Sequence, residues 1–256
     1  MIFETHAHYD DQAFDEDREE LLAQLQKNGI SYAVNVSSDL ESCRKTLELT
    51  KSHAFLYGAL GIHPSDTGKL TEKDIVWLGE KSQEKKIVAI GEIGLDYYWD
   101  EPDRDIQKKW FIRQLALAKE KGLPVIIHSR DAAKDTLEIM KEQHAEEIGG
   151  VIHCFSYGPE IAEEYLKMGF YIGIGGVLTF QNAKKIKEVT GMLPLDRILL
   201  ETDSPYLAPA PNRGKRNSSL NIPYIIEEMA RLKGLSSEEI ESATMENAKR
   251  MYRISE

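Results

Sequence analysis

Short apolar runs alternate along the chain with longer stretches whose apolar positions recur at helical spacing. The short runs carry few charges, as is typical of parallel strands buried on both faces of a sheet. The pattern predicts strands at Ile2–Glu4, Tyr32–Val36, Phe55–Gly61, Ile87–Ile90, Val125–Ile127, Gly150–Ile152, Phe170–Ile174 and Ile198–Leu200. It predicts helices near Asp15–Lys27, Leu40–Lys51, Glu72–Glu84, Arg104–Lys121, Ala132–His144, Pro159–Met168, Gln181–Val189, Ile222–Lys233 and Ser237–Tyr252.

This repeated alternation of strand and helix predicts parallel β/α units. A closed TIM-type (β/α)8 barrel typically needs about 250 residues, and the chain has 256. An open, doubly wound sheet is the alternative. No linker, low-complexity segment or block of like charge divides the sequence, so we expect residues 1–256 to form one domain.

The composition is that of an ordinary globular protein, with 41% hydrophobic and 29% charged residues. No apolar run approaches the roughly 20 residues of a membrane span, and the N-terminus enters a strand without the pattern of a signal peptide. Cys43 and Cys154 form no paired motif, which argues against a disulfide framework. We therefore expect a cytoplasmic protein without a membrane partner; the oligomeric state is left open.

The formal net charge of −11 argues against a protein that coats nucleic acid with a basic surface. It is compatible with an enzyme that holds phosphates locally, through metal ions and a few arginines. Carboxylates that surround metal ions would themselves add to the negative charge.

Histidines mark the end of the first predicted strand. Residues two apart in an extended chain point the same way, so His6 and His8 should project side by side, an arrangement that suits two bonds to one metal ion. Glu4 has the same phase and is expected to face inward, one step deeper.

Further candidate ligands follow later strands. Of the seven histidines in the chain, five lie at predicted strand ends and only His53 and His144 do not. Taken singly, each such residue has an ordinary structural explanation. Taken together, they should converge on the face where barrel enzymes place their active sites. The candidate metal ligands are His6, His8, Glu92, His128, His153 and Asp203.

Four imidazoles and two carboxylates are more than one zinc ion normally binds. They favour two divalent ions that share one carboxylate. Two ions about 3.5–4 Å apart can contact the attacking and leaving oxygens of a phosphoryl transfer and activate a hydroxide as the nucleophile. Zinc suits imidazole ligands, whereas carboxylates and phosphates also accept magnesium or manganese, so the identity of the ions is open.

The loop after the eighth strand, from Pro209 to Asn217, is basic within an acidic protein. Its charges could form a solvated cluster, but its place beside the candidate ligands favours phosphate contacts from Arg213 and Arg216. Arg130, two residues after His128, is a third candidate for phosphate binding. Cys154 follows His153 directly and is expected to point to the opposite side as a small buried apolar residue.

These residues resemble the TatD family of metal-dependent hydrolases within the amidohydrolase-like barrels, over nearly the whole chain. The resemblance rests on Thr5-His6-Ala7-His8, Gly61-Ile62-His63-Pro64, Gly91-Glu92-Ile93-Gly94-Leu95-Asp96-Tyr97, the segment from Pro124 to Ala132, His153-Cys154-Phe155-Ser156, the segment from Glu201 to Leu207, Arg213-Gly214-Lys215-Arg216-Asn217 and Asn247-Ala248. Two positions depart from the family pattern: Glu4 stands where aspartate is usual, and Ala7 where cysteine is common.

The resemblance implies a TIM-type barrel and a cytoplasmic deoxyribonuclease that depends on divalent metal ions. Family members described as nucleases are similar to 3'-to-5' exonucleases acting on single-stranded DNA. One ion would be held by His6, His8, Glu92 and Asp203, and the second by Glu92, His128 and His153. We further predict that Asp203 accepts the proton of the attacking water, and that His63 contacts the scissile phosphate or a metal-bound water without being a ligand.

Two rival functions fit the same ligands. Related barrels hydrolyse amides, esters or lactones, and the arginines named above favour a phosphodiester instead. A metal-dependent binding protein without activity would be expected to lack a ligand, and none is missing. The residues do not distinguish DNA from RNA, because none identifies a contact to a 2'-hydroxyl.

Overall fold

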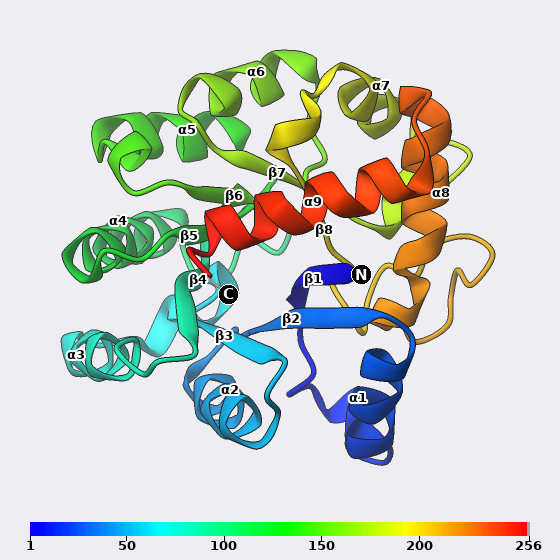
Figure 1. Ribbon diagram of the computed structural model, residues 1–256. Helices are drawn as coiled ribbons and strands as arrows, with labels where there is room; N and C mark the ends of the chain where they lie inside the picture. Colours follow the sequence, from blue (N-terminus) through cyan, green and yellow to red (C-terminus); the bar gives the residue numbers. More distant parts are fainter. Residues whose placement is uncertain (255–256) are drawn as a thin grey trace.

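Parallel strands in sequence order form one sheet in the computed structural model, which describes residues 1–254 (Figure 1). The strands are β1 (Ile2–Ala7), β2 (Ile30–Val36), β3 (Leu56–Leu60), β4 (Ile87–Asp96), β5 (Val125–Arg130), β6 (Gly150–Ile152), β7 (Tyr171–Ile174) and β8 (Ile198–Leu200). A backbone bridge between Ala7 and Ser204 brings the chain after β8 beside β1 and nearly closes the sheet into a barrel. The expected TIM-type (β/α)8 barrel is confirmed.

The helices alternate with the strands and surround them. They are α1 (Arg18–Lys27), α2 (Leu40–Ser52), α3 (Glu72–Lys81), α4 (Arg104–Lys121), α5 (Ala133–Glu142), α6 (Pro159–Lys167), α7 (Lys184–Met192), α8 (Ile222–Lys233) and α9 (Ser237–Met251). Capping boxes begin α3, at Thr71 and Asp74, and α9, at Ser236 and Glu239. Each box satisfies backbone N–H groups that a helix start would otherwise leave unpaired.

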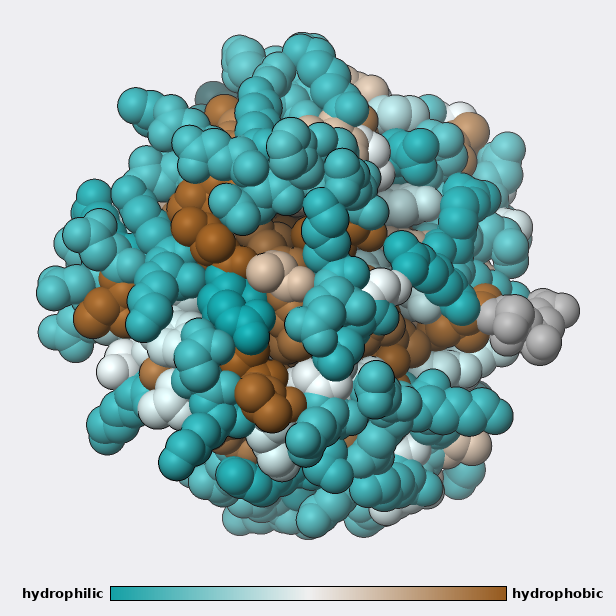
Figure 2. Space-filling view, turned by 90° about the vertical axis from the view of Figure 1, so that its left-hand side faces the viewer, coloured by the Kyte–Doolittle hydropathy of each residue, from teal (hydrophilic) through white to brown (hydrophobic). Residues whose placement is uncertain are grey.

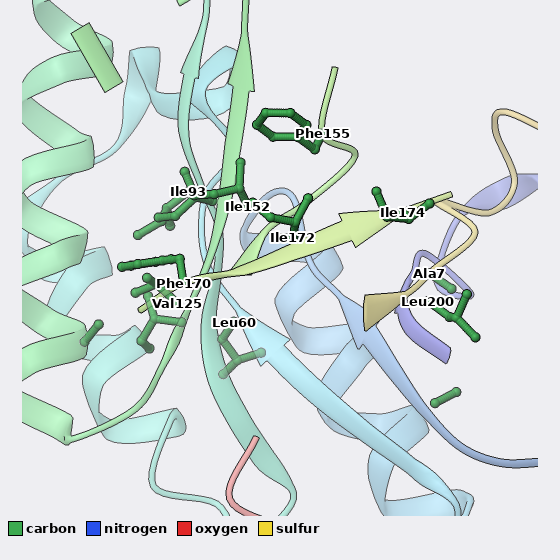
Figure 3. Packing of buried hydrophobic residues seen from close by; sticks show 14 of the residues in the cluster. Ala7, Leu60, Ile93, Val125, Ile152, Phe155, Phe170, Ile172, Ile174 and Leu200 are labelled. Atoms are coloured by element: carbon green, nitrogen blue, oxygen red, sulfur yellow. The ribbon is translucent and has the colours of Figure 1, made fainter. Parts of the chain in front are cut away.

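Successive side chains of each strand point to opposite faces of the sheet and form two apolar layers. Side chains of one phase, such as Val34 and Val36, belong to a cluster inside the barrel. Side chains of the other phase pack in the layer between strands and helices. Figure 3 shows Ile93, Ile152 and Ile172 of that outer layer close together on β4, β6 and β7.

Helix α9 lies across the barrel and covers its N-terminal end (Figure 1). The hydroxyl of Tyr252, just beyond α9, donates a hydrogen bond to the carbonyl of Thr5 at 2.7 Å. The amide of Asn247 donates to the carbonyl of Ile198 at 2.9 Å. The carboxyl end of the barrel is therefore the end left for a site.

Polar side chains cover most of the side of the barrel shown in Figure 2, with hydrophobic ones visible between them. Among residues 1–254, no helix is both long enough and apolar enough to cross a lipid bilayer.

The orientation expected for Glu4 is wrong. The register of β1 shifts between Glu4 and Ala7, which breaks the simple alternation from Glu4 to His6. Glu4 lies opposite Ala33, a residue of the outer layer. Its carboxylate accepts hydrogen bonds from the hydroxyls of Thr202 at 2.6 Å and Ser219 at 2.9 Å, instead of lying beneath the histidine rings.

Candidate metal centre

The six candidate ligands gather at the carboxyl end of the barrel. His6 comes from β1 and His8 from the residue after it, Glu92 from β4, His128 from β5, and His153 and Asp203 from the segments after β6 and β8. All but the fully buried His6 line a cavity of about 700 Å³ that opens at this end. A register shift between Ile90 and Ile93 interrupts the alternation of β4 and lets Glu92 join the cluster.

Glu92 stands between two sets of imidazoles. Its Oε1 lies 2.6 Å from Nδ1 of His128 and 2.8 Å from Nε2 of His153. Its Oε2 lies 3.5 Å from Nε2 of His6 and 3.8 Å from Nε2 of His8. Each carboxylate oxygen therefore faces a different pair of histidines.

Asp203 completes the set around Oε2 of Glu92. Its Oδ1 lies 3.3 Å from Nε2 of His8 and 3.8 Å from Nε2 of His6. Two nitrogens bonded to one tetrahedral zinc ion at about 2.0–2.1 Å would stand roughly 3.3 Å apart. The Nε2 atoms of His6 and His8 are 3.2 Å apart, so this donor set fits one ion without rearrangement.

The electrostatics of the cluster suit a cation. Burial alone would raise the pKa of Glu92, but the imidazoles of His153 and His128 hold it well below its usual range. Burial also acts to raise the pKa of Asp203, but the hydrogen bond with His8 and the charges of the nearby imidazoles together outweigh it, so that pKa is lowered. Both carboxylates are therefore ionised at neutral pH and available as ligands.

The imidazoles respond to the same charges. Burial acts to lower the pKa of His8, but the hydrogen bond and attraction of Asp203 raise it to about 9. Burial likewise opposes the charged form of His153, but the carboxylates of Glu92 and Glu201 together raise its pKa well above the usual value. A bound divalent ion would take the place of these protons beside the carboxylates.

Residues beyond the candidate ligands hold the imidazoles in place. Nδ1 of His8 lies 2.7 Å from the carbonyl of Val36, which leaves Nε2 toward the cluster. Nε2 of His128 lies 3.1 Å from Oδ2 of Asp96, which leaves Nδ1 toward Glu92. Such partners fix the tautomer and ring orientation of metal-binding histidines.

His63 enters the site from the end of β3. Its ring lies edge-on to that of His128, with centroids 4.4 Å apart. Its Nδ1 accepts a hydrogen bond from the backbone of Ser65 at 3.2 Å, so Nε2 carries the proton when the ring is neutral. Burial lowers the pKa of His63 to about 3, which keeps that ring neutral. One group of potential ligand atoms, within 4.8 Å of one another, joins His63 with Glu92 and His128.

The three arginines expected to contact substrate are placed differently. Arg130 lines the cavity. Arg216 and Arg213 are not among the residues that line it. Arg216 forms a two-point ion pair with Asp17, with N–O distances of 2.5 and 2.7 Å, and Arg213 lies over the ring of Phe180 at 4.5 Å. Only Arg130 is brought beside the candidate ligands.

The expectation for Cys154 is wrong. The residue has a positive φ of 45°, so the chain leaves the extended conformation after His153. Cys154 consequently lines the cavity instead of facing away from it. Burial raises the pKa of its thiol, so it is a neutral group at the cavity wall.

Sequence reasoning missed two carboxylates of the site, Asp96 and Glu201. Asp96 contacts His128 as described above, and Oε1 of Glu201 lies 3.6 Å from Nδ1 of His153. A signal for Glu201 was present, because it precedes Asp203 by two residues and such residues face the same way in a strand. The same alternation marked Asp96, which stands four residues after Glu92 at the end of β4.

Comparisons with known proteins identify the family of this chain. The family model described as "TatD related DNase" matches residues 3–253. The chain is 47% identical over 254 residues to the uncharacterized metal-dependent hydrolase YabD of Bacillus subtilis, covering 99% of this chain and 100% of that protein. It is 35% identical over 257 residues to the uncharacterized metal-dependent hydrolase YcfH of Escherichia coli K12, covering 99% and 96% of the two chains.

Solved structures give the same result. The crystal structure of YJJV, a TatD homolog from Escherichia coli K12, superimposes with a TM-score of 0.93 at 30% identity, covering 99% of this chain and 98% of that one. A TatD family hydrolase from Entamoeba histolytica superimposes with a TM-score of 0.88 at 25% identity and the same coverage.

The barrel fold, the group of candidate metal ligands and the relatives together identify the chain as a metal-dependent hydrolase. More particularly, the chain belongs to the TatD family.

Proposed function

We propose that this protein is a metal-dependent phosphodiesterase, acting as a 3'-to-5' exodeoxyribonuclease on single-stranded DNA with two divalent ions per chain. One observation carries the proposal: the two oxygens of Glu92 face two separate pairs of histidines, with Asp203 beside one pair. A single carboxylate with one oxygen toward each histidine pair suits a bridge between two cations. The family description as a DNase supports the choice of substrate.

The proposed ligands of one ion are His6, His8, Glu92 and Asp203. Those of the second are Glu92, His128 and His153. When bound, zinc, magnesium or manganese ions would neutralise the charge that develops on the phosphate oxygens and lower the pKa of a water molecule to near neutrality.

Further roles in the proposed reaction are proton transfer from the attacking water and binding of the substrate phosphate. Asp203, ionised and lining the cavity, accepts the proton of the attacking water. His63 is held neutral by burial and presents an Nε2–H that can donate to a phosphate oxygen or to the leaving group. Arg130 contacts a phosphate of the substrate.

The test is degradation of end-labelled oligonucleotides by protein loaded with each metal in turn. Single-stranded DNA labelled at the 5' end should give a ladder of shortened products, and a 3' label should be released first as a mononucleotide. Chelation with EDTA should stop the reaction, and re-addition of metal should restore it. RNA of the same sequence, assayed in parallel, measures discrimination between the two sugars.

A panel of small substrates separates this proposal from its rival. Chromogenic phosphodiesters, esters and lactones are assayed with the same metal-loaded protein. Hydrolysis of phosphodiesters alone supports the nuclease. Turnover of esters or lactones without any cleavage of nucleic acid would replace the proposal with an acyl-transfer hydrolase on the same barrel.

A further inference from the structure

Exposed aromatic side chains gather at the mouth of the cavity. Among residues 1–254, eight large hydrophobic residues are exposed, and four of them lie in the loops after β4 and β8. These four are Tyr98, Trp99, Tyr206 and Leu207. Trp99, Tyr206 and Leu207 line the cavity itself. Exposed apolar residues gathered around a cavity mark a binding surface better than the same residues scattered singly.

Tyr98 and Trp99 leave much of their ring surface in water. Trp99 is 64% exposed and Tyr98 is 55% exposed. The two rings meet edge to face, with centroids 5.0 Å apart. Aromatic carbon is less stable in water than in contact with another apolar surface, so an exposed ring face favours a planar ligand laid against it.

The loop that carries the two rings is anchored by its neighbours. The backbone N–H groups of Tyr98 and Trp99 both donate to Oδ1 of Asp96, at 2.9 and 3.3 Å. The other oxygen of Asp96 faces His128, so one carboxylate joins this loop to the metal centre. The preceding Tyr97 is engaged elsewhere, because its hydroxyl donates to Asp135 at 2.7 Å.

Arg130 adds a positive charge to the same surface. Its guanidinium lies over the ring of Tyr98, 3.8 Å from the centroid. Within the described part of the chain, Arg130 forms no ion pair, whereas Arg216 is engaged by Asp17. The donors of Arg130 therefore remain available to an anion in the cavity.

We propose that Trp99 forms a stacking platform for one nucleobase, with Tyr98 packed at right angles against it, while Arg130, over the ring of Tyr98, binds the phosphate next to that base. The ligand is a nucleotide unit of a single-stranded nucleic acid, because a base inside a duplex is stacked on both faces. Stacking depends little on base identity, so the platform is expected to be tolerant of sequence. This inference rests on the proposed nuclease function and assigns it a binding subsite.

The platform is tested with single-stranded oligonucleotides that carry one abasic nucleotide, moved stepwise along the last three positions at the 3' end. Removing the base that occupies the platform should lower kcat/KM about tenfold or more in the wild-type protein. The variant Trp99→Ala should lose a similar factor on the intact strand. The same variant should lose little further on the abasic strand, because the base and the ring act as one pair.

Three further variants sharpen the result. Trp99→Phe keeps an aromatic face and should recover most of the loss. Tyr98→Ala should weaken binding less than Trp99→Ala, because it removes the ring that supports Trp99 and Arg130 and leaves the stacking face in place. Tyr224→Ala is the matched control, because Tyr224 is an exposed aromatic on α8, is not among the residues that line the cavity, and should leave kinetics unchanged. Circular dichroism verifies that each variant is folded.

The outcomes separate the platform from the function. If the wild-type protein cleaves single-stranded DNA and Trp99→Ala cleaves it equally well, the platform is overturned and the nuclease stands. Equal losses on intact and abasic strands would also overturn it, because the ring would then act without a base. If the wild-type protein cleaves no nucleic acid with any metal, the proposed function itself fails.

A second inference comes from a different place, the interior beneath the metal centre. Among the described residues, three buried polar atoms near one another lack a hydrogen-bond partner: Nδ1 of His6, Nδ1 of His153 and Oε2 of Glu201. Potential ligand atoms of these three residues lie within 4.8 Å of one another. The rings of His6 and His153 are stacked, with centroids 3.8 Å apart and planes at 12°.

Two arrangements could satisfy these atoms. A cation could bind between them, or both Nδ1 atoms could carry protons directed at Glu201. A neutral imidazole has a single lone pair, and the Nε2 atoms of both histidines already face Glu92. Lone pairs at Nε2 leave protons at Nδ1, which excludes the first arrangement whenever the metal centre is formed.

We infer that Glu201 is a positioning residue that accepts both Nδ1 protons and so keeps the two histidines in the tautomer that binds metal. Two further contacts fix the position of the Glu201 carboxylate. The backbone N–H of Cys154 donates to its Oε1 at 2.6 Å. Gly173 of β7 packs against its carboxylate, where the Cβ of any other residue would collide with it.

The test is Glu201→Gln, which keeps the shape but directs an amide N–H toward one imidazole. Metal affinity, measured by titration of the apo protein, should fall about 10- to 100-fold, as for other outer-shell partners of metal sites. Nitrogen NMR of labelled histidine should show that the uniform Nδ1–H form of His6 and His153 is lost. Glu228→Gln is the matched control, because it makes the same chemical change in a carboxylate on α8 that pairs with Lys187 and Arg231 and is not among the residues that line the cavity.

Unchanged affinity together with unchanged histidine tautomers in Glu201→Gln would overturn this role. A third ion in the wild-type protein, lost in that variant, would overturn it as well, because it would show that the cluster is itself a metal site.

Discussion

The two oxygens of Glu92 each face a different pair of imidazoles, which makes this carboxylate the centre of the site. A bridge needs negative charge on both oxygens, because two divalent ions at close range repel each other strongly. We predict that Glu92→Gln binds at most one ion per chain and loses nearly all nuclease activity. Metal analysis of the purified variant decides the matter, and two tightly bound ions with full activity would refute the bridge.

Asp203 is predicted to have a different effect from Glu92. Asp203→Asn keeps an oxygen near His8 but lowers the basicity of the group that we propose as the acceptor of the water's proton. Turnover should fall by about 10²-fold or more, the usual contribution of a general base. KM for an oligonucleotide should change little, because the substrate contacts are retained. Steady-state kinetics on the variant reports both quantities, and near-normal turnover would remove Asp203 from proton transfer.

A variant at His63 tests whether this residue donates a proton or binds a metal ion. Burial lowers the pKa of His63 to about 3, so its ring is neutral at neutral pH and can donate from Nε2–H. His63→Ala should therefore reduce turnover while the metal content stays near that of the wild-type protein. Loss of one ion in this variant would instead make His63 a ligand beside Glu92 and His128, whose atoms lie within reach.

Residue types at strand ends could be predicted from the sequence, but some of their directions could not. The cluster of histidines was visible because residues ending parallel strands converge in any barrel. Glu4 was predicted to face the wrong way, because a register shift within β1 leaves no mark on the local pattern. The direction predicted for Cys154 was also wrong, because its positive φ turns the chain where the prediction assumed that strand alternation continues.

Elements as a whole followed the sequence more closely, because the apolar period is sustained over each strand and helix. The contacts made by the loops between them were predicted less well. The loop after β8 was expected to bring two arginines to the substrate, yet Arg216 is paired with Asp17, a residue far away in sequence. Long-range pairs of this kind cannot be read from local composition.

The arginines of these two loops are expected to differ in their effect on substrate binding. Arg130→Ala should raise KM for single-stranded DNA and lower the slope of affinity against salt by about 0.7, the value for one lost phosphate contact. Arg216→Ala should leave that slope unchanged, because its charge is already neutralised by Asp17. Arg213→Ala tests the remaining sequence-based expectation. A flatter slope for Arg216→Ala would return the loop to substrate binding.

The candidate metal centre lies at one end of the barrel only. Helix α9 and Tyr252 cover the N-terminal end, while the charged cluster lies at the other end and outside the inner apolar cluster. The apolar layers therefore do not depend on the ions, and the apo protein is expected to remain folded. This separation explains why so much functional variation can be carried at the carboxyl end of a barrel.

Metal removal tests this separation on the whole molecule. An ion present at a hundred times its Kd stabilises the native state by about 2.7 kcal/mol, and each kcal/mol shifts the Tm of a barrel this size by roughly 2–4 °C. EDTA should therefore lower the Tm by about 5–10 °C per ion lost without abolishing the cooperative transition. The effect should grow as pH rises toward 9, because protons compete with metal at His8, whose pKa is raised to about 9. Calorimetry in matched buffers with and without EDTA measures both. A transition that disappears in EDTA would show that the ions hold the barrel itself together, and a Tm shift independent of pH would exclude proton competition at His8.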